Sequence, residues 1–139
     1  SLEPKRRAKA IQSAKSMGLN VITEIGKKQA GLTLSPQPFM DVFWADVSEG
    51  AAYILVEGRE SGENIGVFNK EGALELELID RICQNVTVEK LIWEAPKKAQ
   101  QIQFIKRIGN HVNLGNISFT DILSLESFRR GLRSDTFRQ

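Results

Sequence analysis

Hydrophobic and polar positions follow two different periods along this chain. Stretches with apolar residues every three or four positions, the spacing of an amphipathic helix, alternate with short apolar or β-branched runs that favour strands. The predicted helices cover residues 4–17, 38–50, 73–84, 97–108 and 121–133, and the predicted strands cover 20–25, 53–56, 90–93 and 111–114. The expected order is therefore one helix followed by four strand–helix pairs.

This order predicts a parallel α/β protein. Strands that alternate with helices are joined by right-handed crossovers, and such crossovers make a sheet parallel. Short, mostly apolar strands are typical of sheets that are covered on both faces. Two architectures fit, an open doubly wound sheet and half of a (β/α)₈ barrel. No Gly-x-Gly-x-x-Gly turn follows a predicted strand, which weighs against a dinucleotide-binding fold.

Composition narrows the class of protein. The 139 residues are 41% hydrophobic and 26% charged, which indicates a single soluble domain over residues 1–139. The net charge of +2 is too small to indicate binding to nucleic acid or to an anionic membrane, and no apolar run is long enough to cross a bilayer. The lone cysteine, Cys83, has no partner for an internal disulfide, so we expect a cytoplasmic protein. We expect Cys83, Trp44 and Trp93 in the core.

Candidate site residues follow the predicted strands. Active sites of parallel α/β proteins lie at the carboxyl ends of the strands, and all four predicted strands carry polar or charged residues there. These residues are Glu24, Lys27 and Lys28; Glu57, Arg59 and Glu60; Glu94; and Asn113 and Asn116. Residues two positions apart share a face of a strand, so carboxylates and cations from neighbouring strands could converge.

These residue types suit a small phosphorylated acid. Lysine can pass protons when its pKa is lowered, the arginine fork matches phosphate or carboxylate, and carboxylates can hold Mg²⁺. The same residues could instead be surface ion pairs, a charge network at the rim, a helix cap at Glu94, or asparagines that hold a loop. His111 is expected at the start of a strand in a structural role, and no Ser/His/Asp set is available. Residue spacing alone therefore leaves the reaction open.

Five stretches, in order along nearly the whole chain, carry a family resemblance. They are 23–28 (TEIGKK), 56–62 (VEGRESG), 93–101 (WEAPKKAQQ), 112–117 (VNLGNI) and 125–137 (LESFRRGLRSDTF). Together they resemble the phosphosulfolactate synthase family. The resemblance implies a (β/α)₈ barrel of roughly 250 residues, of which this chain would supply strands five to eight, the C-terminal portion. A half-barrel exposes sheet edges and core, so we expect a longer protein or association, and a homo-oligomer.

The resemblance also implies a reaction, in which Mg²⁺ supports the addition of sulfite to phosphoenolpyruvate and gives (2R)-phospho-3-sulfolactate for coenzyme M or sulfolactate biosynthesis. Lys28 would protonate C2, with Lys27 as the alternative acid, and Arg59 would bind an anionic group. The remaining implied site residues are Glu24, Glu57 and Glu94 as metal ligands or orienting groups, and Asn113, Gly115 and Asn116 at the phosphate. Two alternatives stay open, another barrel lyase or aldolase acting on a phosphorylated acid, and a non-catalytic stress-associated homologue.

Overall fold

A single parallel sheet organises the computed structural model, which describes residues 3–26, 34–58, 63 and 66–133. Within these residues the strands are β1 (Ile22–Ile25), β2 (Tyr53–Val56), β3 (Leu91–Glu94) and β4 (Leu114–Gly115). Their order in the sheet is their order in the chain, and each neighbouring pair is parallel. A doubly wound sheet reverses its strand order at a switch point, and no such reversal occurs among these strands.

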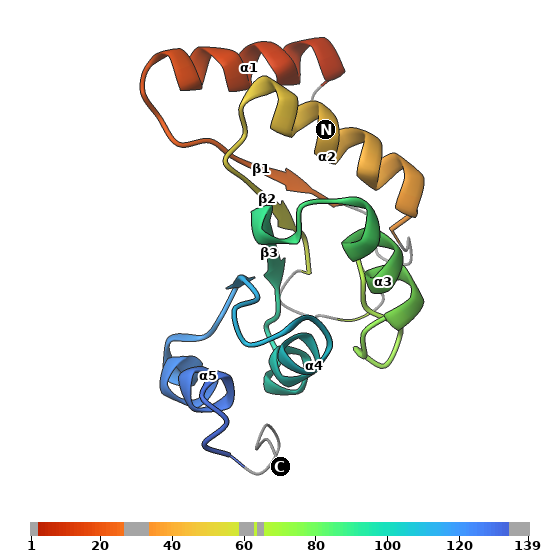
Figure 1. Ribbon diagram of the computed structural model, residues 1–139, viewed down its shortest axis with the longest axis vertical. Helices are drawn as coiled ribbons and strands as arrows, with labels where there is room; N and C mark the ends of the chain where they lie inside the picture. The colour runs from red at the N-terminus through yellow and green to blue at the C-terminus, as the bar shows by residue number, and fades with distance from the viewer. Residues whose placement is uncertain (1–2, 27–33, 59–62, 64–65, 134–139) are drawn as a thin grey trace.

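Helices connect the strands and lie against one side of the sheet. They are α1 (Pro4–Ser16), α2 (Pro36–Glu49), α3 (Leu76–Asn85), α4 (Lys98–Ile108) and α5 (Ile122–Arg129), with short 3₁₀ turns η1 (Val88–Lys90) and η2 (Phe119–Asp121). Figure 1 shows α2, α3 and α4 on the same side of the strands, with α1 beyond α2 and α5 beside α4. Pro36 opens α2, where its missing N–H costs no helical hydrogen bond, and Gly50 ends it in the left-handed conformation with φ of 109°.

The core lies between the sheet and these helices. In β2, Ile54 and Val56 are fully buried, and in β3 Leu91 and Trp93 are fully buried, so alternate residues of each strand face the helices. Phe104 of α4 packs on Trp93 with ring centroids 5.2 Å apart. The other large buried side chains are Phe39, Phe43, Phe68, Ile79, Ile82 and Phe128.

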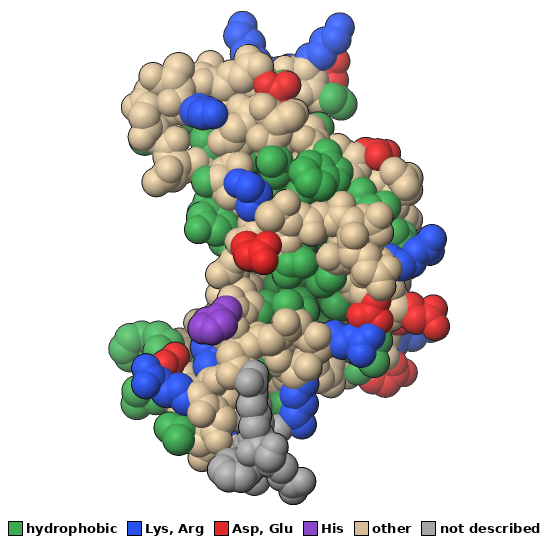
Figure 2. Space-filling model, viewed as in Figure 1, with side chains coloured by type: hydrophobic (Ala, Val, Ile, Leu, Met, Phe, Trp, Pro, Cys, Tyr) green, Lys and Arg blue, Asp and Glu red, His purple; other side chains and the backbone are tan. Residues whose placement is uncertain are grey.

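The opposite face of the sheet is not covered by any described helix. The side chains that alternate with the buried ones remain accessible, since Ile22 is 57% exposed and Tyr53 is 42% exposed, while Leu55 and Ile92 are half-buried. Figure 2 shows hydrophobic side chains open to solvent in the middle of the molecule and around α5. Sequential parallel strands with helices on one face only are the arrangement of one wall of a (β/α)₈ barrel.

Most predicted elements form close to the expected positions, and three differ. The strand expected at 111–114 forms at Leu114–Gly115, because the chain turns tightly after Gly109 and the amide of Val112 donates to the Gly109 carbonyl. The helix expected at 73–84 begins at Leu76, since Leu74 pairs with Phe68 in an isolated bridge. The last helix ends at Arg129, and Gly131 follows with φ of 66°.

The two tryptophans differ from each other. Trp93 lies in the core as expected, but Trp44 is 48% exposed, so its predicted core position is wrong. Trp44 follows Phe43 directly in α2, and two consecutive helical residues cannot both face the sheet. The Trp44 ring lies edge-on to Phe43 and its indole N–H donates to the Asn85 carbonyl at 3.1 Å.

Among the described residues, no helix has the length and apolar character to cross a membrane.

Candidate active site at the carboxyl edge of the sheet

Three glutamates stand at the carboxyl edge of neighbouring strands. Glu24 is near the end of β1, Glu57 follows β2 directly, and Glu94 is the last residue of β3. The register aligns Glu24 with Leu55 and Leu55 with Ile92, which places Glu24 and Glu94 on the uncovered face. Parallel pairing therefore brings the predicted carboxylates to one edge, as the sequence indicated.

Glu57 lies tightly against the backbone at the end of β1. Its amide donates to the Ile25 carbonyl at 3.1 Å, which continues the β1–β2 ladder by one residue. A Cβ added at Gly26 would lie 2.2 Å from Oε2 of Glu57 and 2.4 Å from its Cβ. Only glycine fits there, so the end of β1 and the Glu57 carboxylate are positioned together.

Glu94 is oriented by the backbone of the neighbouring strand end. Its Oε2 accepts a hydrogen bond from the Gly58 amide at 2.8 Å. A Cβ at Gly58 would lie 2.7 Å from the Glu94 carbonyl oxygen and 2.9 Å from the Phe68 ring. The absence of a side chain at Gly58 thus permits the close approach of the two strand ends that this hydrogen bond requires.

The residues predicted around β4 separate into two groups. Gly115 pairs with Glu94, and Asn116 follows it in the left-handed conformation with φ of 55°, so both lie at the carboxyl edge. The Asn113 side chain instead donates to the carbonyls of Glu89 and Leu91, at 2.9 and 3.1 Å, at the amino end of β3. The structure therefore does not bring the Asn113 amide to the glutamates.

The predicted cations of the site, Lys27, Lys28 and Arg59, lie outside the described residues, as does Glu60. Their roles stay predictions. The glycines that directly precede these cations in the sequence are described. Gly26, before Lys27, lies against Glu57, and Gly58, before Arg59, lies against Glu94. The segments that carry the predicted cations therefore start from the strand ends that hold the carboxylates.

A metal site built from three protein ligands is not present among the described residues, because no three histidine, cysteine, aspartate or glutamate side chains gather closely enough. Magnesium commonly takes only one or two carboxylates and completes its shell with water and substrate oxygens. Glu57 and Glu94, half-buried at adjacent strand ends, offer oxygen donors of this kind. The residues present are thus compatible with Mg²⁺, and the metal itself remains a proposal.

The family can be assigned from comparison with known proteins. Residues 1–135 match the family model described as (2R)-phospho-3-sulfolactate synthase (ComA). The chain belongs to the phosphosulfolactate synthase family. The resemblance seen in the sequence is thereby confirmed, and the parallel α/β wall described above fits part of the barrel that we predicted for a family member.

Relatives named phosphosulfolactate synthase match most of this chain. The protein from Methanocaldococcus jannaschii is 46% identical over 135 residues, which is 94% of this chain and 53% of the relative. The protein from Methanothermobacter thermautotrophicus is 39% identical over 137 residues, 97% of this chain and 53% of the relative. The Bacillus subtilis protein is 39% identical over 120 residues, 84% of this chain and 47% of the relative. The chain spans about half the length of the curated relatives it matches.

One polar cluster of this synthase-family chain was not predicted. Asp46 of α2 is 2% exposed, and its carboxylate accepts hydrogen bonds from the Arg7 guanidinium and from the Thr23 hydroxyl. The carboxylate beside Arg7 raises the pKa of that guanidinium above its ordinary value. A signal was available, since Asp46 follows the buried Phe39 by seven positions and Phe43 by three, which is the core-facing spacing of α2.

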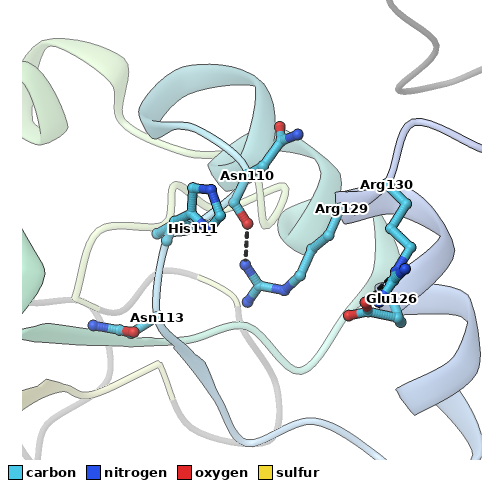
Figure 3. A pocket seen from close by; sticks show the side chains of 7 residues that line it. Asn110, His111, Asn113, Glu126, Arg129 and Arg130 are labelled. Atoms are coloured by element: carbon cyan, nitrogen blue, oxygen red, sulfur yellow. Dashed lines mark hydrogen bonds and ion pairs between the residues drawn. The ribbon is translucent and has the colours of Figure 1, made fainter.

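A cavity of about 420 Å³ lies at the opposite, amino edge of this family member's sheet. Figure 3 shows Asn110, His111 and Asn113 on one side of it, and Glu126, Arg129 and Arg130 of the α5 region on the other. Arg129 donates to the Asn110 carbonyl at 2.5 Å, and burial lowers the pKa of its guanidinium. His111 therefore lies at the amino edge of the sheet, away from the carboxyl edge, as its expected place before the strand end implied, and its structural role stays a prediction.

Proposed function

We propose that the intact protein is a phosphosulfolactate synthase, a lyase that adds sulfite to phosphoenolpyruvate and gives (2R)-phospho-3-sulfolactate. The observation that carries this proposal is the family match over residues 1–135, together with 39–46% identity to relatives of that name. In the reaction, the sulfur of sulfite bonds to the methylene carbon C3 as the C2–C3 double bond opens. The electron pair moves to C2 and the carboxylate, C2 then takes a proton, and the phosphate ester stays intact.

Glu57 and Glu94 are the residues we propose to hold Mg²⁺. Both carboxylates lie at the carboxyl edge, and Glu94 is oriented by the Gly58 amide. Bound Mg²⁺ would act as a Lewis acid on substrate oxygens where negative charge develops. Glu24, which is exposed on the uncovered face, is the third candidate carboxylate and would orient a neighbouring cation.

The proton and the anionic groups need cations. We assign protonation of C2 to Lys28, with Lys27 as the alternative acid, and binding of an anionic group to Arg59. Gly115 and Asn116 would border the phosphate, because barrels often bind phosphate beside their last strands. Asn113 has no part in this proposed pocket, since its side chain donates to carbonyls at the amino end of β3 and its own carbonyl accepts from the Trp93 amide. We further propose a cytoplasmic homo-oligomer.

The test is sulfite-dependent consumption of phosphoenolpyruvate by the intact protein, followed by ³¹P NMR. A new phosphate ester should form only when sulfite and Mg²⁺ are both present. The Lys28→Ala variant should lose turnover by about a hundred-fold or more, the usual contribution of a general acid, whereas Lys27→Ala should lose far less. Turnover with another nucleophile but not with sulfite would favour a different barrel lyase. Failure of the folded protein to bind phosphoenolpyruvate would favour the non-catalytic homologue.

The metal assignment has a separate readout. Calorimetry should detect Mg²⁺ binding to the intact protein, and Glu94→Gln should weaken it by at least ten-fold because Gln carries no negative charge. Glu89→Gln is the matched control, since Glu89 lies in η1 at the amino end of β3. Equal Mg²⁺ affinity in the two variants would exclude Glu94 as a ligand.

A further inference from the structure

A partly buried ionic network ties two helices to the strand that leads into the candidate site. Arg7 of α1 donates from Nε to Oδ1 of Asp46 at 2.7 Å and from Nη2 to Oδ2 at 2.5 Å. The Thr23 hydroxyl of β1 donates to the same Oδ2 at 2.6 Å. A second hydrogen bond from Nη2 of Arg7 reaches the Glu24 carbonyl at 3.0 Å. One carboxylate of α2 thus links α1, α2 and β1.

The network acts on the last residues of β1. The Thr23 hydroxyl is held by Asp46 on the helix-facing side of β1, and the Glu24 carbonyl is held by Arg7. The Glu24 side chain lies on the uncovered face of the sheet. Gly26 follows two residues later and contacts Glu57 so closely that no Cβ could be added. A shift of this strand end would therefore move Glu24 and disturb Glu57 as well.

Stability alone is a weak reason for such a network. Burying a carboxylate and a guanidinium carries a desolvation cost that offsets much of their attraction, and apolar replacements are often no less stable. The Asp46 side chain is 3% exposed and that of Arg7 is 22% exposed, so the pair is largely removed from water. Charged hydrogen bonds of this kind do fix geometry, because each donor must stay aligned with one oxygen.

We propose that Arg7, Asp46 and Thr23 are positioning residues that hold the carboxyl end of β1, and through it Glu24 and Glu57, in the geometry that sulfite addition requires. The inference rests on the proposed function. None of the three side chains needs to touch substrate, since Asp46 and Thr23 act from the helix-facing side of the strand. Misplacement of a site by about 1 Å can lower turnover by as much as a hundred-fold.

The decisive variant is Thr23→Val in the intact protein, with Thr23→Ser as its conservative partner. Valine keeps the shape of threonine and removes the hydroxyl, whereas serine keeps the hydroxyl. We expect Thr23→Val to lower kcat by about ten-fold or more with a smaller change in the KM for phosphoenolpyruvate, and Thr23→Ser to restore kcat to within about two-fold of the wild type. Asp46→Asn should lower kcat at least as much, since it removes the charge that aligns Arg7.

The control is Asp80→Asn, which breaks a similar forked contact with Arg107 between α3 and α4, on the exposed surface. It should leave kcat unchanged. Circular dichroism at the assay temperature establishes that each variant is folded. If Asp46→Asn unfolds, the inference is judged from the kcat values of Thr23→Val and Thr23→Ser. An active wild type whose folded Thr23→Val variant keeps its kcat overturns the inference alone, even if that variant unfolds at a lower temperature. A folded wild type without sulfite-dependent turnover overturns the proposed function and the inference with it.

Discussion

Replacing Gly58 by alanine tests the close approach of β2 and β3 at the carboxyl edge. The added Cβ would lie 2.7 Å from the Glu94 carbonyl oxygen, 2.9 Å from the Phe68 ring and 3.1 Å from the Cβ of Glu94. Ordinary contact would require the carbonyl and the new methyl group to separate by about 0.7 Å. Neither a strand carbonyl nor a fully buried ring can move that far without disturbing its neighbours.

The expected cost combines two effects. Forcing one methyl group into a packed site costs about 1–3 kcal/mol. Displacement of the strand end also weakens the hydrogen bond from the Gly58 amide to the Glu94 carboxylate, and bonds to charged groups contribute about 1.5–3 kcal/mol when intact. We therefore expect Gly58→Ala to lower the free energy of unfolding by about 2–4 kcal/mol.

Urea unfolding of the intact protein, followed by circular dichroism, measures this loss through the shift of the transition midpoint. Gly115→Ala is the matched control at the same edge, since its new Cβ would meet the Cγ2 methyl group of Ile92 at 3.1 Å, and ordinary contact needs a separation of only about 0.3 Å more. The control should cost less than about 1 kcal/mol. Equal midpoints for the two variants, or a Gly58→Ala midpoint equal to that of the wild type, would refute the steric argument.

Three further outcomes follow from burial and charge. Ile54→Ala in the fully buried part of β2 should destabilise the protein by about 2–5 kcal/mol, whereas Leu123→Ala on exposed α5 should change the urea midpoint little; similar losses would contradict the assignment of the core. Burial raises the pKa of the Cys83 thiol from 9.0 to about 11, so the unfolded chain loses this proton first and stability should fall as pH rises from about 9 to 11. Cys83→Ala should flatten that part of the pH profile, and an unchanged profile would exclude the thiol as its cause. The Arg107 guanidinium lowers the pKa of Asp80, but the pair is exposed, so Asp80→Asn should leave the urea midpoint within error at high salt.

The pattern of apolar and polar residues predicted the helices and strands, because it depends on which side of each element is buried. The run at 53–56 became β2 with the expected bounds, since its alternate residues Ile54 and Val56 are both buried against helices. The placement of Glu24, Glu57 and Glu94 at one edge could be predicted as well, because parallel strands share their carboxyl ends.

Features that depend on distant partners could not be predicted. Asn113 was expected at the site, but its amide finds the carbonyls of Glu89 and Leu91, which only the folded sheet brings within reach. Asp46 stands on the core side of α2, and its partners Arg7 and Thr23 come from elements far away in the chain. The uncovered face was expected only from the family resemblance, which implied a half-barrel. The strand patterns alone do not predict it, since apolar strands look the same whether helices or barrel-interior side chains cover them.

The neighbour-by-neighbour order of the strands has a consequence for how this scaffold can change. Three of the strands each have their own glutamate at the carboxyl end: Glu24 in β1, Glu57 after β2 and Glu94 in β3. A separate connecting segment follows each glutamate. One connecting segment can therefore be lengthened or rewritten while the hydrogen-bonded ladders beside it stay as they are. Variation in substrate preference among such proteins can accumulate segment by segment, with the wall of strands conserved as a common support.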